Sequence, residues 1–298
     1  MKAAAFSYLR PKRLTEVLQL LAEHGDEARL LAGGQTLLAT LNMRLSEPAL
    51  LIDMQAVSEL KGLSLQGDTL RIGALVTHTE MEASALVVRH APLLSAAAPH
   101  IAHRAIRNLG TFGGSIAYGD PAAEWPACLL ALNGVVLARS LRGERRISVD
   151  DFFTGLYSTE LAPDEVIVAC EIPVAQAGQK FSFTELARRH GDYAVVGLAA
   201  SATLQRGLVS QVRLAWLGVG STPIRSPAAE AALLEQPFNA ETAASAVRAL
   251  RGELEPLADL THSEAAKRQL ASVLLKRALQ GWMASPGVFA DAQQNTSL

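Results

Sequence analysis

Residues 108–126, NLGTFGGSIAYGDPAAEWP, form the most informative stretch of this 298-residue chain. Glycines and hydroxyl residues lie close together near its start, namely Gly110, Thr111, Gly113, Gly114 and Ser115. Because glycine has no Cβ, a ligand can approach its backbone closely, and successive free amides in such a turn bind anions. Asp120 and Glu124 follow, and their carboxylates can accept hydrogen bonds from ligand hydroxyls. The stretch therefore predicts a diphosphate site followed by a site for a sugar.

A second glycine pair, Gly33-Gly34, lies in residues 30–36, LLAGGQT. One Gly-Gly turn is ordinarily a tight connection without a ligand. Two such loops, each with a hydroxyl residue beside its glycines, favour a ligand-binding role. The chain has neither GxxxxGK(S/T) nor a GxGxxG that follows a strand, which disfavours a P-loop nucleoside triphosphatase and a Rossmann domain.

The composition is that of an ordinary globular protein with ample apolar residues for a core, 49% of the total. A net charge of −2 disfavours nucleic acid as a partner. No run of 18 uncharged apolar residues is present and no long apolar segment precedes Arg10, so we expect a cytoplasmic protein that is not an integral membrane protein. Cys128 and Cys170 stand far apart without a CxxC motif, so we expect both to be buried and neither to hold an iron–sulfur cluster or zinc.

The pattern of apolar residues predicts an α+β protein. Helices are expected at 14–24, 92–103, 227–235, 240–251 and 264–283. A further helix is expected to start at the capping box of Thr77 and Glu80, and a capping box of Thr261 and Glu264 precedes the last helix. Strands are expected at 29–31, 50–53, 63–65, 70–74, 135–138, 145–149, 165–172, 181–186, 194–203 and 211–218. The small polar segment 174–179 indicates a domain boundary. We therefore expect a domain over 1–176, with subdomains of about 1–55 and 56–176, and a C-terminal sheet-and-helix domain over 177–298.

Three segments resemble one known family. Residues 32–54, AGGQTLLATLNMRLSEPALLIDM, and 106–127, IRNLGTFGGSIAYGDPAAEWPA, resemble the two FAD-binding signatures of the medium subunit of molybdenum hydroxylases, the carbon monoxide dehydrogenase and xanthine dehydrogenase group. Residues 188–200, RRHGDYAVVGLAA, resemble the start of that family's C-terminal domain. The resemblance spans nearly the whole chain. It implies a two-subdomain FAD-binding domain, similar to that of vanillyl-alcohol oxidase, followed by a C-terminal domain of antiparallel sheet plus helices.

The resemblance also implies a set of FAD-binding residues. They are Ala32, Gly33, Gly34, Gln35, Thr36, Ile101, Thr111, Gly113, Gly114, Ser115, Asp120, Glu124, Leu161 and Tyr193. Glu124 takes the position that holds the ribose hydroxyls, where Asp is commoner, and Ile101 takes one that lies against the adenine. Leu161 and Tyr193 take positions beside the isoalloxazine ring. No side chain is expected to act as a general acid or base, and His100-x-x-His103 has too few companions for a metal site.

The resemblance implies that the chain is the FAD-carrying electron-transfer subunit of a heterotrimer. Its partners would be a cysteine-rich small subunit with two-iron iron–sulfur clusters and a large molybdopterin subunit, and the flavin would pass electrons to an external acceptor. A free-standing FAD-dependent oxidase or reductase and a nucleotide-binding regulatory module are the alternatives. The substrate of the complex stays open among purines, other N-heterocycles, aromatic thioesters and carbon monoxide, and the acceptor among NAD, quinone, oxygen and a carrier protein.

Overall fold

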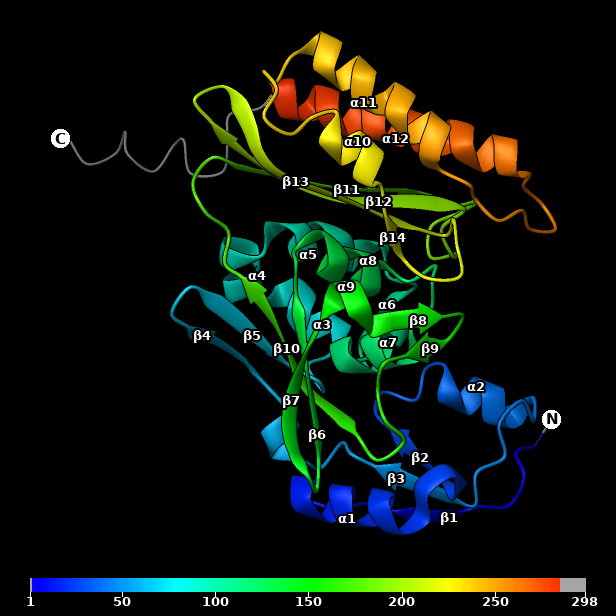
Figure 1. Ribbon diagram of the computed structural model, residues 1–298. Coiled ribbons are helices and arrows are strands. Elements are labelled where there is room, and N and C mark those ends of the chain that lie inside the picture. The colour runs from blue at the N-terminus through cyan, green and yellow to red at the C-terminus, as the bar shows by residue number, and fades with distance from the viewer. Residues whose placement is uncertain (1, 285–298) are drawn as a thin grey trace.

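The computed structural model describes residues 2–284, which fold into three lobes stacked along one axis (Figure 1). Each lobe contains its own β-sheet. The N-terminal and C-terminal lobes lie at the two ends, and the central lobe separates them. None of the helices in residues 2–284 is long and apolar enough to cross a membrane.

The N-terminal lobe is a small α/β unit. Its parallel sheet has the order β1-β3-β2, formed by β1 (Ser7–Leu9), β2 (Ala28–Leu31) and β3 (Leu50–Asp53). Helix α1 (Leu14–His24) buries the apolar stripe that predicted it, and α2 (Leu37–Asn42) follows the first glycine loop. The expected helix and the strands β2 and β3 are confirmed. Strand β1 was not predicted, because it is only three residues long and all three are exposed.

The central lobe has a five-stranded sheet with the order β4-β5-β10-β6-β7. Its strands are β4 (Leu63–Gln66), β5 (Thr69–Gly73), β6 (Val135–Ser140), β7 (Gly143–Ser148) and β10 (Val166–Pro173), and a small hairpin is formed by β8 (Phe153–Gly155) and β9 (Ser158–Thr159). Its helices are α3 (His78–Ala83), α4 (Ala85–His90), α5 (Pro92–Ala97), α6 (Arg104–Arg107), α7 (Phe112–Tyr118), α8 (Glu124–Ala131) and α9 (Val149–Phe152). The Thr77–Glu80 capping box is confirmed at the start of α3.

Three predictions about helices in the chain are wrong. The helix expected over 92–103 ends at Ala97, and a 3-10 turn (Ala98–His100) follows, because Pro99 lacks the amide that a continuing α-helix needs. The glycine-rich stretch 108–126 is not an open loop but contains α7 and the start of α8. Thr261 does not cap the last helix: its amide donates to Asp259, and Ser263 Oγ instead accepts from the amide of Ala266.

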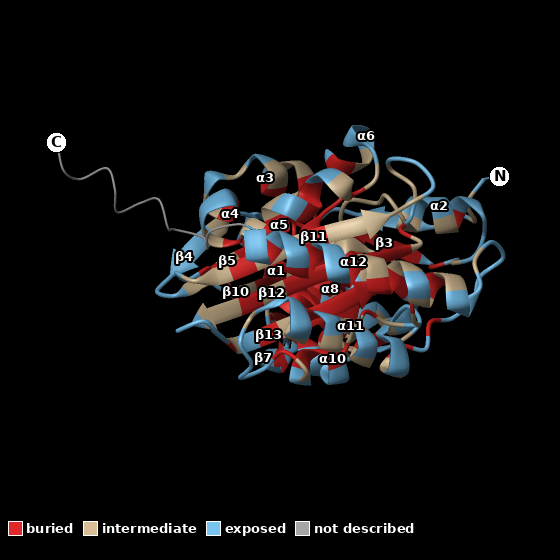
Figure 2. Ribbon diagram, turned by 90° about the horizontal axis from the view of Figure 1, so that it is seen from above, coloured by how far each residue is buried: buried red, intermediate tan, exposed pale blue. Residues whose placement is uncertain are grey.

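The C-terminal lobe is an antiparallel sheet covered by helices on one face. Its order is β11-β12-β13-β14, formed by β11 (Gln179–Leu186), β12 (Val196–Gln205), β13 (Leu208–Leu217) and β14 (Ile224–Arg225). Helices α10 (Pro227–Ala231), α11 (Ala240–Glu253) and α12 (Glu264–Ala284) lie on the face away from the central lobe. Figure 2 shows exposed residues on the outer side of α11 and α12 above buried strands. Helix α10 is shorter than expected from the sequence.

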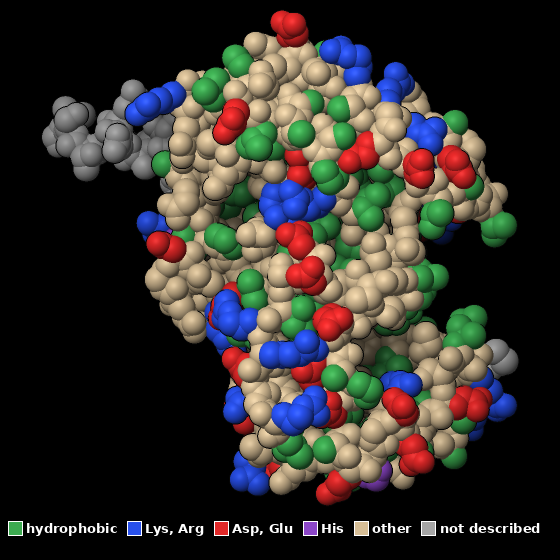
Figure 3. Space-filling view, viewed as in Figure 1, with side chains coloured by type: hydrophobic (Ala, Val, Ile, Leu, Met, Phe, Trp, Pro, Cys, Tyr) green, Lys and Arg blue, Asp and Glu red, His purple; other side chains and the backbone are tan. Residues whose placement is uncertain are grey.

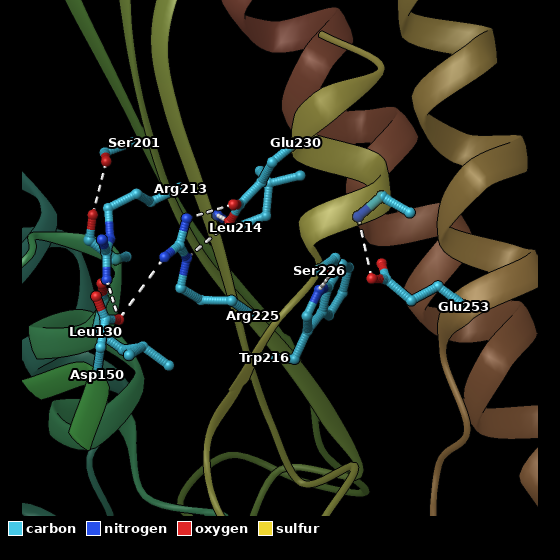
Figure 4. A network of polar contacts seen from close by, with 12 residues as sticks. Leu130, Asp150, Ser201, Arg213, Leu214, Trp216, Arg225, Ser226, Glu230 and Glu253 are labelled. Carbon is cyan, nitrogen blue, oxygen red and sulfur yellow. Dashed lines mark hydrogen bonds and ion pairs between the residues drawn. The ribbon is translucent and has the colours of Figure 1, made fainter. Parts of the chain in front are cut away.

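The other face of this sheet is fixed to the central lobe by polar contacts (Figure 4). Arg213 on β13 donates to the carbonyl of Leu130 at 2.8 Å and pairs with Asp150 of α9, which also lies 3.7 Å from Arg225. Ser201 donates to the carbonyl of Ala131 at 2.7 Å. These contacts fix the end of α8 against β12 and β13, so the position of α8 sets the position of the C-terminal lobe.

A buried histidine anchors the second glycine loop. The His78 amide donates to the Gly110 carbonyl at 2.9 Å, and His78 Nδ1 accepts from Trp125 Nε1 at 2.9 Å. A Cβ on Gly110 would lie 2.6 Å from His78 Nε2, so only glycine fits there. Burial, helped by the charge of Arg107, lowers the pKa of His78 to about 4. His78 is therefore neutral at physiological pH and ties the loop to α8.

This arrangement predicts a pH-dependent effect of His78→Gln. The unfolded chain protonates His78 near its usual pKa of about 6.5, whereas the folded chain does so only near 4. The free energy of folding that the neutral His78 ring contributes is therefore fully present above pH 6.5, and it is lost as the pH falls toward 4. Urea unfolding should show that His78→Gln is destabilised at pH 7, and that its deficit relative to wild type shrinks by about 2 kcal/mol at pH 5.

His24→Gln is the matched control, because His24 is exposed at the end of α1. Its difference from wild type should be the same at both values of pH. A deficit of His78→Gln that stays constant between pH 7 and pH 5 would contradict the neutral, buried state of His78.

Candidate cofactor site

The two glycine loops touch each other across the boundary between the N-terminal and central lobes. A Cβ on Gly33 would collide with the Leu109 carbonyl oxygen and lie 2.7 Å from Gly110 Cα. The first loop connects β2 to α2, and the second connects α6 to α7. Figure 3 shows the molecule hollowed on the side where the lobe carrying α2 meets the rest. The contact places both loops at one site.

The free amides at this site belong mostly to the first loop. Within the described residues, five backbone amides here lack a protein acceptor, those of Gly33, Gly34, Gln35, Thr36 and Thr111. Gly34 has φ +70°, a left-handed conformation that favours glycine. Successive free amides in such a turn form a concave site for an anion. The first loop thus fits the diphosphate of FAD.

The second loop differs from the sequence-based expectation of successive free amides. The amides of Gly110, Phe112 and Gly113 donate to the carbonyls of Ile106, Val76 and Ala74, and that of Gly114 donates to Thr111 Oγ1 at 3.1 Å. The expectation is wrong for these four, because α7 begins here and its first amides are satisfied by neighbouring backbone and by the Thr111 cap. A Cβ on Gly113 would lie 2.6 Å from Ala74, so this glycine serves packing.

Gly114 is different from its neighbours, because it faces the gap between the loops. A Cβ there would meet only Thr111 Oγ1 at 2.7 Å and the Cβ of Ala32, on the first loop, at 3.6 Å. Ala32 therefore lines the same gap. The hydroxyls of Thr36 and Ser115 have no hydrogen bond with any described residue, whereas Gln35 Nε2 donates to the Gly33 carbonyl at 2.9 Å and braces its own loop.

Asp120 lies just beyond the end of α7, where Gly119 takes a left-handed conformation with φ +64°. Asp120 is buried, and its Oδ1 accepts from the Ala122 amide at 2.9 Å, as expected of a turn residue. Burial raises the pKa of its carboxyl group. One carboxylate oxygen is thus used by the turn, which leaves the other for a ligand.

Glu124 is the first residue of α8 and is half-buried. Burial, with smaller contributions from the charges of Glu185 and Asp120, raises the pKa of Glu124 to about 8. No other residue in the described part of the chain forms a hydrogen bond with its side chain. A half-buried carboxyl group that no other residue of the described chain pairs with fits a ligand that offers hydroxyl groups.

Ile101 and Leu161 belong to the apolar core of the central lobe. Ile101 is buried and Leu161 is half-buried against the same cluster. Arg107 holds the Ile101 turn, because its guanidinium donates to the carbonyls of Ile101 and Ala102 at 3.0 and 3.1 Å and pairs with Glu82 at 3.1 Å. The guanidinium of Arg107 is thus occupied by the protein.

Tyr193 follows the loop after β11 and is 71% exposed. That loop packs on the central lobe, since a Cβ on Gly191 would lie 2.6 Å from His103 Nδ1. Although most of the Tyr193 surface reaches solvent, the protein atoms packed around its ring and the neighbouring charge of Asp120 raise its pKa. Tyr193 therefore shares the electrostatic environment of Asp120, at the end of α7.

Some residues at the site were not singled out from the sequence. Tyr118 and Tyr157 pair with ring centroids 4.9 Å apart, and Tyr157 has φ +53° at the tip of the β8–β9 hairpin. His78 and Trp125 are joined by the hydrogen bond described above, and Glu185 faces His100 at 3.3 Å. Tyr118 and Trp125 lie in the glycine-rich stretch, which was the one available signal for them. The others come from segments far apart in sequence.

Comparison with known proteins agrees with this geometry. Residues 4–175 match the family model described as the FAD binding domain in molybdopterin dehydrogenase. Residues 181–281 match the model of the CO dehydrogenase flavoprotein C-terminal domain. Together the two models cover most of the chain.

Similar proteins match over almost their full length. The chain is 39% identical to the 6-hydroxypseudooxynicotine dehydrogenase complex subunit alpha of Paenarthrobacter nicotinovorans, covering 94% of this chain and 95% of that protein. It is 35% identical to the carbon monoxide dehydrogenase medium chain of Hydrogenophaga pseudoflava, with 92% and 96% covered.

Solved structures show the same fold. Carbon monoxide dehydrogenase from Hydrogenophaga pseudoflava matches with a TM-score of 0.92 and 37% identity, covering 95% of this chain and 99% of that chain. Quinoline 2-oxidoreductase from Pseudomonas putida 86 matches with a TM-score of 0.88 and 38% identity, covering 95% and 100%. The sequence-based resemblance is thereby confirmed, and the chain belongs to the family of FAD-binding subunits of molybdenum hydroxylases that includes the medium chain of carbon monoxide dehydrogenase.

Proposed function

We propose that this chain carries FAD between its two glycine loops and passes electrons from the iron–sulfur clusters of a partner subunit to an external acceptor. The observation that carries the proposal is the group of free amides in residues 33–36, opposite the open face of Gly114. We also propose the domain division expected from the sequence, 1–176 and 177–298, because β10 ends at Pro173 and β11 begins at Gln179.

Each part of the cofactor is assigned to chemically suitable residues. The diphosphate is assigned to the free amides and the hydroxyls of Thr36 and Ser115, with Ala32 and Gly114 leaving room for it. The ribose hydroxyls are assigned to Glu124 and Asp120. The adenine is assigned to the apolar surface at Ile101, and the isoalloxazine ring to Leu161 and Tyr193.

Bound FAD supplies the redox chemistry, since its ring accepts and releases electrons. The residues of this chain bind it, orient it and shield it from water. This role requires no general acid or base that acts on a substrate. A free-standing oxidase would need such a group, and the similar proteins are subunits of multi-subunit dehydrogenases, so the electron-transfer role is the better supported.

The partners that we propose are a cysteine-rich iron–sulfur small subunit and a large molybdopterin subunit in a heterotrimer. Similar proteins are named as a medium chain, a medium subunit or a complex subunit. Cys128 and Cys170 are both buried, and burial raises the pKa of each thiol, so neither is suited to ligate a cluster. A cytoplasmic location stays a prediction from the sequence.

The first test concerns the identity of the flavin. Two glycine loops and the half-buried carboxyl group of Glu124 imply a diphosphate and a second sugar, which FAD has and FMN lacks. Heat release and chromatography of the flavin from the purified chain should yield FAD, and the flavin-free chain should bind FAD in preference to FMN. A chain that retains only FMN, or none after incubation with excess FAD, would overturn the assignment.

The second test is Gly114→Val. The added side chain would displace Thr111 Oγ1 and fill the gap toward Ala32, so FAD affinity should fall at least about tenfold. Fluorescence titration of the flavin-free variants gives the affinities. Gly252→Val is the matched control, because a Cβ there meets nothing within 4 Å and the backbone of α11 is unstrained. Equal affinity in the two variants would refute the diphosphate site.

The third test concerns the partners. Affinity purification of the tagged chain from its native cells should recover two further subunits, one rich in cysteine and iron and one containing molybdenum. The isolated chain should show no substrate hydroxylation, because the molybdenum centre that we propose for this reaction belongs to a partner subunit. Turnover by the isolated chain, without molybdenum or iron, would support the free-standing oxidase instead.

A further inference from the structure

Glu185 is a charged residue of the C-terminal lobe whose side chain is buried. It lies near the end of β11, where side chains alternate between the two faces of the sheet. Phe181 and Phe183, four and two residues earlier, both pack in the core of the central lobe. Glu185 is on the same face, its side chain is only 7% exposed, and it therefore points at the central lobe.

One carboxylate oxygen of Glu185 has a polar neighbour and the other has none. Its Oε1 lies 3.3 Å from Nδ1 of His100, which belongs to the turn after α5 and packs on Phe183 with ring centroids 5.1 Å apart. Its Oε2 is buried and has no hydrogen-bond partner among the residues that the structure describes. A buried carboxylate oxygen without a donor is costly, which is why such atoms nearly always have a partner.

Glu185 reaches the central lobe beside a residue of the proposed FAD site. Its contact His100 directly precedes Ile101, which is assigned to the adenine. The negative charge of Glu185 also contributes to the raised pKa of Glu124, on α8. Neither Glu124 nor Glu185 Oε2 receives a hydrogen bond from another residue in the described part of the chain.

A carboxylate oxygen accepts hydrogen bonds, so a group that pairs with Glu185 Oε2 must offer a donor. FAD carries such donors in its hydroxyl and amino groups.

We propose that Glu185 is a further FAD-contacting residue, whose Oε2 accepts a hydrogen bond from a hydroxyl or amino group of the cofactor, so that FAD joins the C-terminal lobe to the central lobe. This inference rests on the proposed FAD site. It adds to that site a residue from a different domain, and it gives the C-terminal lobe a direct part in binding the cofactor.

The test measures ligand binding by the full chain freed of flavin. Isothermal titration with FAD should show that Glu185→Ala weakens binding at least about tenfold, as expected when a hydrogen bond to a charged group is lost. Glu185→Gln keeps the volume and one acceptor oxygen, so its loss should be smaller. Titrations with ADP and with FMN, which represent the two halves of FAD, then locate the donor. Only the ligand that contains the half touching Glu185 should bind Glu185→Ala more weakly than wild type.

Thr184→Val is the matched control. Thr184 is the preceding residue of β11, and its buried hydroxyl also lacks a partner among the described residues. It pairs with Leu198, which belongs to the core of the C-terminal lobe, so it is on the opposite face of the sheet. Thr184→Val should bind FAD like wild type.

The outcomes separate this inference from the proposed function. If wild type binds FAD and Glu185→Ala binds it equally well, Glu185 is not a ligand and the inference is overturned, while the FAD site stands. Equal losses in Glu185→Gln and Thr184→Val would also overturn it, because they would reflect damage to β11. If wild type binds no FAD, the proposed function fails and the inference fails with it.

Discussion

The backbone contact between Gly33 and the Leu109–Gly110 segment is the constraint on which the site depends. It brings a loop of the N-terminal lobe against a loop of the central lobe without any side chain between them. A Cβ at Gly33 would force the lobes apart and open the gap lined by Ala32 and Gly114. The free amides of the first loop and the open face of Gly114 would then no longer lie close enough to contact the same ligand.

The arginine side chains near the site already form ion pairs with carboxylates of the protein. Arg107 and Arg104 pair with Glu82, and Arg189 pairs with Asp192 in the loop before Tyr193. These guanidinium groups are therefore partly neutralised by the protein itself. The negative charge of a diphosphate would be met mainly by oriented amide dipoles, which are fixed in place before the ligand arrives. Such a site depends on exact backbone geometry more than on salt bridges, which explains the density of glycine.

Much of the fold was predictable, because its elements carry local signals. The apolar stripe of α1, the Thr77–Glu80 capping box and the hairpin turns of the central sheet all appear in sequence as they do in the structure. The wrong prediction for residues 108–126 has a tertiary cause. In residues 108–126 the glycines were taken as signs of a loop, yet Gly110 and Gly113 are required by contacts with His78 and Ala74, which are distant in sequence. Tertiary packing decided their role, and no local pattern shows it.

The residues of the candidate site also differ in whether a local sequence pattern predicts them. The glycine loops could be recognised from the sequence because their glycine and hydroxyl residues are neighbours along the chain. Glu185 could not be recognised, since a glutamate in a strand usually faces solvent. Its position becomes meaningful only when Arg213 and Ser201 fix β12 and β13 to the end of α8, because this docking turns the face that bears Glu185 toward the central lobe. Glu185 and Glu124 belong to different lobes, so they influence each other only when the two lobes are docked. A ligand that supplies donors to both carboxyl groups must favour the docked arrangement over any other, so cofactor binding and domain docking are thermodynamically linked.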